Sequence, residues 1–454
     1  MHAERSRSVS WGHGQTAALP SACVIATPDA ARVLDAVDAL SDQMLVELRD
    51  VLRIPSVSGT DAENDAQQHM GDVLGRGGME VDLWQIDLPA ITSHTDFPGM
   101  EVDRSEAWGL VGRLAGSDPD SGGTLMLNGH IDVVPTGDRA AWHDAPFDAV
   151  VRDGSLFGRG ACDMKAGLIA AHWAVQAMRT SGVTLRGDLL LASVQGEEDG
   201  GLGTFATLQR GWTADACIIP EPTNLDIIPA NSGALTFRLR LRGMATHAAR
   251  RTDGVSAIDS FVPVLAALHQ LEARRHAVVD PLVARWDLAH PLSIGTITAG
   301  DWASSVPDLL IAEGRLGVAI DEPFDHAKAE FEEAIAEVCE SDPWLRTHPV
   351  EVEWWGGQFA SGRLPEHSDL VERVRAAHDI ASERRPLEVY GAPYGSDLRL
   401  LTGLGGIPTL QYGPGDAADA HAPVEHVVLA DVAVTARTLA LMALDVCGSA
   451  ASNP

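Results

Sequence analysis

The first strong pattern along the chain is helical. Between Asp29 and Leu52 the apolar residues recur three or four positions apart, as they do on one face of a helix. Pro55 follows, and proline ends or kinks a helix because it has no backbone N–H to donate. We therefore predict a helix over 29–52, preceded by a loose N-terminal tail over 1–28.

Beyond this helix, short apolar runs alternate with a second helical stretch. The runs are bounded by turn residues and predict strands over 108–114, 124–134 and 189–194. An Ala-rich stretch over 166–178 predicts a helix between the last two strands. Strands that alternate with helices indicate an α/β fold, with a mostly parallel sheet covered by helices on both faces. In such sheets the functional loops lie at the carboxyl ends of the strands.

A different order of elements begins after Pro229. The patterns predict a strand, a helix, two strands, a helix and a strand, in that order, over 235–241, 255–271, 293–297, 309–320, 326–338 and 350–355. This βαββαβ order predicts a ferredoxin-like α+β unit inserted into the first domain. We therefore expect a first domain formed by 29–230 and 358–454, and an inserted domain over 231–357.

Composition and charge limit the partners of the chain. Its 454 residues are 45% hydrophobic, which is enough for two cores. Acidic residues number 64 against 33 Lys and Arg, giving a formal net charge of -31, which argues against a nucleic acid or an anionic membrane as partner. The apolar stretches are shorter than the roughly 18 to 20 residues of a membrane span. The cysteines are scattered without a CxxC pair, as in a reducing compartment, so we expect a cytoplasmic protein.

Polar residues that suit metal binding follow the predicted strands. The strand in TLMLNGHIDVVP runs into His130 and Asp132, which point to the same face. His130 could bind a metal ion while Asp132 orients it. Taken alone, a buried structural histidine near a turn explains this pair equally well. GRGACDMKAG places Asp163 among glycines at the start of a helix, where it is either a ligand or a helix cap.

Further carboxylates gather after the next strands. The strand over 189–194 is followed by Glu197 and Glu198, which repel each other unless a cation or a proton compensates. A solvated acidic turn is the alternative. Another apolar run ends in Glu221, and His421 stands in AHAPVEHV near the C-terminus. Imidazole and carboxylate ligands without thiolate suit zinc, cobalt or manganese.

Together these motifs resemble a family of zinc aminoacylases and deacylases. Its members include acetylornithine deacetylase, succinyl-diaminopimelate desuccinylase and glutamate-releasing carboxypeptidases. The resemblance covers residues 30–445, and GHIDVVP, GRGACDMKAG, GEEDGG, EPT and AHAP occur in the family's order. It implies a catalytic domain with an inserted lid and dimerisation domain, and therefore a homodimer.

The resemblance also implies two divalent metal ions, with zinc as the first choice. In the family, the residues that match His130, Asp163 and Glu221 hold one ion. Those that match Asp163, Glu198 and His421 hold the second ion. The matching aspartate bridges the two ions.

Five more residues match functional positions of that family. Glu197 matches the general base, and Asp132 matches the aspartate behind the ligands. His247, in RGMATHA, matches a histidine that polarises the scissile carbonyl, often in the site of the partner subunit; an exposed loop histidine is the alternative. Ser396 and Arg399, in GAPYGSDLRLL, match a region that binds the substrate's carboxylate. A surface salt bridge is the alternative for the arginine.

These residues predict a metal-dependent hydrolase that cleaves the amide bond of an N-acylated amino acid or a related small acid. Glu221, followed by Pro-Thr, is more typical of the deacylases than of the carboxypeptidases, so a dipeptidase or carboxypeptidase is the second hypothesis. A non-catalytic binding protein on the same fold is the alternative of another class, and the intact set of repelling carboxylates argues against it. Ser305 stands where many family members carry asparagine, which is a departure from the pattern.

Overall fold

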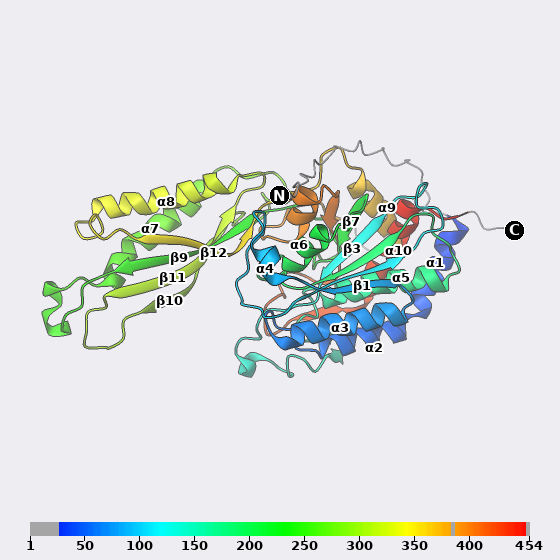
Figure 1. Cartoon of the computed structure of the whole chain (residues 1–454), viewed down its shortest axis with the longest axis horizontal. Coiled ribbons are helices and arrows are strands. Elements are labelled where there is room, and N and C mark those ends of the chain that lie inside the picture. Colours follow the sequence, from blue (N-terminus) through cyan, green and yellow to red (C-terminus); the bar gives the residue numbers. More distant parts are fainter. Residues whose placement is uncertain (1–26, 383–385, 451–454) are drawn as a thin grey trace, which may run out of the picture.

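A computed structural model describes residues 27–382 and 386–450. Over these residues, a six-stranded sheet with its helices forms the larger body of the molecule, and a four-stranded unit extends from one side of it (Figure 1). Residues 1–26, most of the predicted tail, lie outside the described residues. Thr27 caps the first helix, and Pro28 begins it.

Two helices, rather than one, occupy the N-terminal pattern. α1 (Pro28–Ala39) and α2 (Ser41–Leu52) are separated at Leu40. The prediction of a single helix was wrong because the apolar period continues across the break: Val37 and Met44, both buried, are seven residues apart. The break directs α1 against α5 (Lys165–Thr180) and α10 (Leu429–Cys447), and α2 against α3 (Asp61–Arg76) and α5.

The central sheet is mostly parallel, as predicted. Its strands, in spatial order, are β1 (Glu80–Gln85), β2 (Trp108–Leu114), β6 (Leu189–Val194), β3 (Leu125–His130), β7 (Ala216–Ile219) and β14 (Thr409–Gln411). The last four of these run parallel to one another. β2 is antiparallel to both of its neighbours. The reason is its connection to β3, since the segment 115–124 is too short and has no helix to form the crossover that parallel strands need.

Helices cover both faces of this sheet. Every residue of β3, β6 and β7 is buried, which requires a layer on each side. On one face α1, α2, α3, α5, α9 (Leu370–Ala381) and α10 enclose a large apolar cluster. On the other face α6 (Leu202–Gln209) packs on β2 and β6.

Short elements complete the larger body. β4 (Val150–Arg152), β5 (Ser155–Phe157) and β15 (His426–Val428) form a small antiparallel sheet. β8 (Ala230–Asn231) pairs with β13 (Gly362–Arg363), and α4 (Leu88–Thr92) lies between β1 and β2. Short helical segments occur as η1 (Arg139–Ala141) and η3 (Leu400–Leu404) in this body, and as η2 (Ala248–Asp253) in the four-stranded unit. The pairing of β15 with β5 brings the C-terminal loop beside the segment that leads to Asp163.

The inserted unit has the predicted βαββαβ order. It consists of β9 (Gly233–Arg242), α7 (Ala257–Arg275), β10 (Leu292–Ala299), β11 (Leu309–Val318), α8 (Phe324–Ser341) and β12 (Glu351–Phe359). The strands are antiparallel in the order β10-β11-β9-β12, and both helices pack on one apolar cluster of their own. This is a ferredoxin-like arrangement. The domain boundaries, 29–230 with 358–454 and 231–357, stay a prediction.

Four cysteines lie within the described residues: Cys162, Cys217, Cys339 and Cys447. All four are buried and free. In the same part of the chain no helix is long and apolar enough to cross a membrane.

Candidate metal centre

The candidate ligands lie at the carboxyl ends of the parallel strands. His130 is the last residue of β3, and Glu221 follows the end of β7. Glu198 lies in the turn between β6 and α6, and His421 lies in the loop between β14 and β15. Asp163 comes just before α5. Because the four strands run in one direction, their ends bring these side chains to a single edge of the sheet.

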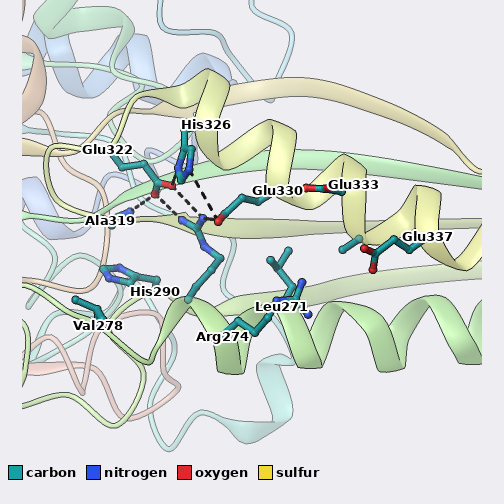
Figure 2. A pocket seen from close by; sticks show the side chains of 12 residues that line it. Leu271, Arg274, Val278, His290, Ala319, Glu322, His326, Glu330, Glu333 and Glu337 are labelled. Carbon is teal, nitrogen blue, oxygen red and sulfur yellow. Dashed lines mark hydrogen bonds and ion pairs between the residues drawn. The ribbon is translucent and has the colours of Figure 1, made fainter.

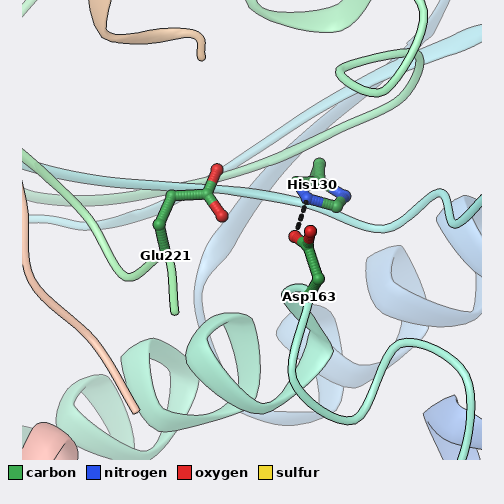
Figure 3. Close-up of side chains that lie close together, drawn as sticks. All are labelled: His130, Asp163 and Glu221. Atoms are coloured by element: carbon green, nitrogen blue, oxygen red, sulfur yellow. Dashed lines mark hydrogen bonds and ion pairs between the residues drawn. The ribbon is translucent and has the colours of Figure 1, made fainter. Parts of the chain in front are cut away.

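His130, Asp163 and Glu221 form the first ligand group (Figure 3). Each offers a ligand atom, and the three atoms lie within 4.8 Å of one another. Nδ1 of His130 is 2.9 Å from the backbone carbonyl oxygen of Asp132, so this nitrogen donates, and Nε2 faces Oδ1 of Asp163 at 3.0 Å. Burial alone would lower the pKa of His130, but the hydrogen bond to Asp163 and the charge of Glu221 raise it well above its usual value. The carboxylates around His130 therefore favour a positive charge at this position.

Asp163, Glu198 and His421 form the second ligand group. Nε2 of His421 lies 3.1 Å from Oε2 of Glu198 and 3.4 Å from Oδ2 of Asp163. Burial tends to raise the pKa of Asp163, but its hydrogen bonds to His130 and His421 outweigh burial and hold that pKa below its usual range. Asp163 thus remains ionised and faces the two groups with different oxygens, which is the arrangement of a bridging carboxylate.

Three glutamates make the site strongly acidic. Glu197 and Glu221 are buried, and the side chain of Glu198 is only 9% exposed. Burial raises the pKa of each of the three, and the charges of neighbouring carboxylates raise it further. Such a cluster needs protons or cations to compensate it. The donor set, with imidazole and carboxylate but no thiolate, fits divalent ions such as zinc, cobalt or manganese.

Glu197 belongs to neither ligand group, but it lines a cavity that opens onto both groups. The backbone N–H groups of Glu197 and Glu198 each donate to the carboxylate of Asp132 at 3.3 Å. Asp132 is buried, and the Ser58 hydroxyl donates to it at 3.0 Å. Its carboxylate is 3.7 Å from Nδ1 of His130, so the orienting contact comes from its backbone carbonyl instead. Asp132 therefore joins the end of β3 to the turn that carries both glutamates.

A buried glutamate that the sequence analysis missed holds the Asp163 loop. Oε1 of Glu425 accepts hydrogen bonds from three backbone N–H groups of this loop, at 2.8, 3.1 and 3.2 Å. Arg159 donates to the other oxygen. Glu425 is four residues after His421, so one short segment carries a ligand of the second group and also fixes the shared ligand. The only signal in the sequence is a charged residue within AHAPVEHV.

A cavity of about 390 Å³ opens onto the two ligand groups. Its walls come from both the larger body and the inserted unit, and include Ala234, Ser293, Arg315, Phe359 and Tyr394. Arg315, on β11, is a second residue that the sequence analysis missed. The sequence gives little indication that Arg315 lines a cavity, because an arginine in an alternating strand usually lies on the solvated face.

The structure brings one of the two predicted substrate contacts to this cavity. Ser396 lines it, and its hydroxyl accepts a hydrogen bond from Gln411 at 2.8 Å. Arg399 does not line it. The Arg399 guanidinium donates to the backbone carbonyls of Ser396 and Gly200, at 2.7 and 2.6 Å, and lies 4.0 Å from the centre of the Phe359 ring. Arg399 therefore stabilises residues of the cavity wall without lining the cavity. Its contact with a substrate carboxylate stays a prediction.

His247 lies away from the cavity of its own chain. It is exposed in the loop after β9, where its backbone pairs with Ser305 and its Nδ1 accepts a hydrogen bond from the N–H of Ala249 at 3.1 Å. It is absent from the described residues that line the cavity. The predicted contact with a scissile carbonyl would require a second subunit, and it stays a prediction.

A larger cavity, of about 720 Å³, lies between α7 and α8 of the inserted unit (Figure 2). Glu322, His326 and Glu330 are close enough there to hold an ion. Arg275, however, already binds both carboxylates, at 2.5 Å in the case of Glu322. Because the guanidinium charge opposes a further cation, we assign no metal to this group.

A family model described as peptidase family M20/M25/M40 matches residues 126–445. The chain belongs to this family. The predicted resemblance is therefore confirmed, and with it the reaction class, since the chain is an amide hydrolase of a metal-dependent family.

Two named relatives and one solved structure are similar to this chain. An N-formyl-4-amino-5-aminomethyl-2-methylpyrimidine deformylase from Halalkalibacterium halodurans is 29% identical over 429 residues, which cover 89% of this chain and 94% of the relative. A succinyl-diaminopimelate desuccinylase from Gluconacetobacter diazotrophicus is 34% identical over 282 residues, which cover 59% of this chain and 64% of the relative. The solved structure of a dipeptidase from Saccharomyces cerevisiae has a TM-score of 0.74 at 17% identity and covers 92% of this chain and 98% of its own. This last likeness confirms the fold of the family.

Proposed function

We propose that this member of the family is a deacylase that hydrolyses the amide bond of a small N-acyl compound, the class that includes N-acylated amino acids and related acids. It would use two divalent ions, with zinc as the first choice and cobalt or manganese as alternatives. The observation that carries this proposal is the position of Asp163, whose two oxygens face two separate ligand groups. Glu197 lines the same cavity outside both groups.

The ligand groups and Glu197 divide the chemistry between them. Two ions held by the groups would activate a water molecule and polarise the amide carbonyl. Glu197 would accept the proton of that water and deliver it to the leaving nitrogen. Its side chain is buried, and its backbone is held by Asp132 at 3.3 Å, so its position is set before substrate binds.

We also propose a homodimer in which His247 reaches the neighbouring site. Its position outside its own cavity supports this. So does the surface of the inserted unit, where Ile258 and Val262 on α7 and Ile297 on β10 are each about half exposed or more. β10 is an edge strand, so it has free backbone groups that can pair with a second strand.

A substrate panel tests the deacylase proposal. Protein stripped of metal and reloaded with zinc or cobalt would be assayed with N-formyl, N-acetyl and N-succinyl amino acids and amines, beside dipeptides. Formyl compounds belong in this panel because the relative from Halalkalibacterium halodurans is named as a deformylase. The Glu197→Gln protein, purified in parallel, controls for a contaminating hydrolase. We expect cleavage of N-acyl compounds.

Two other results would replace the proposal. Cleavage of dipeptides alone would favour a dipeptidase or carboxypeptidase that uses the same site. A protein that binds neither metal and cleaves nothing after zinc or cobalt is added would favour a non-catalytic binding protein on this fold. Metal analysis of the purified protein separates these two results before any substrate is tried.

A cytoplasmic location completes the proposal. The four described cysteines are free, which fits a reducing compartment. Fractionation of cells into cytoplasmic, membrane and exported material tests it. Recovery of the active protein in the exported fraction would contradict it.

A further inference from the structure

The cavity beside the ligand groups has one arginine that could hold a substrate carboxylate. Arg315 lies on β11 and lines the cavity. Among the described lining residues, the other side chain able to carry positive charge is His421, which belongs to the second ligand group. Away from the ions that the ligand groups would hold, the binding of a substrate carboxylate therefore depends on the state of Arg315.

Arg315 is already paired with a carboxylate of the protein. Its Nη2 donates to Oε1 of Glu101 at 2.9 Å. Glu101 lies in the segment between α4 and β2 of the larger body, so this ion pair joins the two parts of the molecule. The positive charge that a substrate carboxylate would seek is thus compensated before any substrate enters.

Glu101 is also held in place from two sides. The Thr236 hydroxyl of β9 donates to its Oε1 at 2.7 Å. On the other side, the backbone N–H of Glu101 donates to Oδ2 of Asp199 at 3.1 Å. Asp199 is itself bound by Arg104, at 2.8 Å. Because these contacts fix the carboxylate beside Arg315, an incoming anion would have to displace a positioned group rather than a mobile one.

The rest of the cavity wall suits an uncharged, flat group. Besides the ligand groups and Glu197, it is formed by prolines, small residues and the rings of Phe359 and Tyr394. Such walls favour an aromatic ring. A carboxylate placed against them without a cation would lose its hydration with no compensating partner.

We propose that Glu101 determines the substrate class: by neutralising Arg315, it makes the enzyme prefer N-acyl derivatives of amines that have an aromatic ring and no carboxylate to N-acyl amino acids that carry a free carboxylate. This inference rests on the proposed deacylase function and narrows it. Glu101 acts through Arg315, so it is a specificity-determining residue and has no part in the bond cleavage itself.

A matched pair of substrates tests this inference. N-formylbenzylamine and N-formylphenylglycine differ only in a carboxylate on the carbon next to the amide nitrogen. The ratio of their kcat/KM values would be measured for the full-length protein loaded with zinc or cobalt. The wild type should favour N-formylbenzylamine. Glu101→Gln keeps an acceptor for Thr236 and removes the charge, so it should shift the ratio about fivefold toward N-formylphenylglycine, as expected for release of one partly exposed ion pair.

Two variants show whether the shift comes from Arg315. In the double variant Glu101→Gln with Arg315→Met, no cation is released, so the shift should disappear. Glu313→Gln is the matched control. Glu313 also lies on β11 and pairs with an arginine, since Arg238 donates to it at 2.7 Å, but it does not line the cavity. This variant should keep the wild-type ratio.

The single variant Arg315→Met gives an independent test that does not require Glu101 to be changed. Because Arg315 is compensated in the wild type, its loss removes no free cation; it leaves the charge of Glu101 unpaired, so the ratio should move by at most about fivefold away from N-formylphenylglycine. A selective loss of about tenfold or more with N-formylphenylglycine would overturn the inference, because it would show that Arg315 already binds the carboxylate.

Other results separate this inference from the proposed function. An unchanged ratio in Glu101→Gln, an equal shift in Glu313→Gln, or a wild type that favours N-formylphenylglycine would overturn the role of Glu101 and leave the deacylase intact. If the loaded wild type cleaves neither formyl compound nor any N-acyl compound of the panel, the deacylase proposal fails, and the role of Glu101 fails with it. Melting temperatures measured beside the kinetics verify that each variant is folded.

Discussion

Glu197 and Glu198 are neighbours in sequence with different surroundings. Glu198 faces His421 and belongs to the second ligand group, whereas Glu197 lines the cavity outside both groups. We therefore expect Glu197→Gln to retain its metal and to lose about two to four orders of magnitude in kcat, the usual worth of a positioned acid–base group. Glu198→Gln should instead lose metal. Metal content after dialysis, measured beside kcat, distinguishes the two, and loss of metal in Glu197→Gln would mean that the roles are exchanged.

Glu425 gives a second prediction at the scale of the residue. Glu425→Gln keeps the size of the side chain but replaces one acceptor oxygen by a donor amide, which cannot satisfy both Arg159 and the loop N–H groups. We expect about 10- to 100-fold weaker binding of the ion in the second group, as for other changes behind metal ligands. Calorimetric titration of the metal-free protein with zinc measures this affinity. Glu366→Gln, at an exposed position, is the control, and equal affinities in both variants would contradict the prediction.

The sequence predicted which candidate ligands lie together, but it did not reveal the residues around them that bind distant parts of the chain. His130, Asp163 and Glu221 could be placed at one edge because each ends a strand, follows one or precedes a helix, and parallel strands share their carboxyl ends. Arg315 and Glu425 could not be found this way. Their importance comes from partners far away in the chain, Glu101 and the Asp163 loop, and no local pattern encodes such contacts. Their partners become visible only once the chain is folded.

At the scale of elements, helix α5 packs on the turn that carries Glu221 with no room for a side chain. A Cβ atom at Gly167 would lie 1.8 Å from the carbonyl oxygen of Pro220. Gly167→Ala should therefore force the helix and the turn apart and lower the free energy of unfolding by about 1 to 3 kcal/mol. It should also weaken metal binding, because α5 follows Asp163 and the turn carries Glu221. Urea unfolding of the metal-free protein gives the first quantity, and zinc titration gives the second.

Gly403 provides the matched control for this substitution. It lies in η3, where a Cβ atom would meet nothing within 4 Å. Gly403→Ala should change the free energy of unfolding by less than about 1 kcal/mol. If the two alanine variants unfold at the same urea concentration, close packing at Gly167 does not support the site.

The bounds of strands that form a single apolar run were predicted correctly. β2 and β6 have the predicted bounds, because a short buried strand reads as an apolar run between turn residues. The break at Leu40 could not be seen, since the apolar residues on both sides stay in phase. The direction of β2 was also hidden, because strand direction depends on the connection and on its neighbour β6, which comes later in the chain.

At the scale of the whole molecule, the ions should stabilise one part and not the other. All the ligands come from the larger body, whereas the inserted unit has its own apolar cluster. Removal of the metal with a chelator should therefore shift only the unfolding of the larger body, by about 2.7 kcal/mol for each ion that was present at a hundred times its Kd. Differential scanning calorimetry measures the two transitions. A single transition that shifts as a whole would contradict two independent domains.

Activity should also depend on the assembly of two whole molecules. If His247 serves the neighbouring site, activity requires a dimer formed through the inserted units, most simply about a two-fold axis. His247→Ala should then fold and bind metal normally. It should be nearly inactive, because an electrophilic contact with the developing oxyanion contributes about 2.7 to 4 kcal/mol to the transition state. A wild-type protein that is fully active as a monomer in analytical ultracentrifugation would reject the shared site.

Mixing two inactive variants gives the sharper test of this shared site. In a mixed dimer of His247→Ala and Glu197→Ala, one site would combine an intact Glu197 with the intact His247 of its neighbour, while the other site would carry both defects. Partial activity should therefore return after subunit exchange, and it can return only if the two residues come from different chains. Mass spectrometry under native conditions would verify that mixed dimers have formed. If verified mixed dimers stay inactive, His247 acts within its own subunit or takes no part in the reaction.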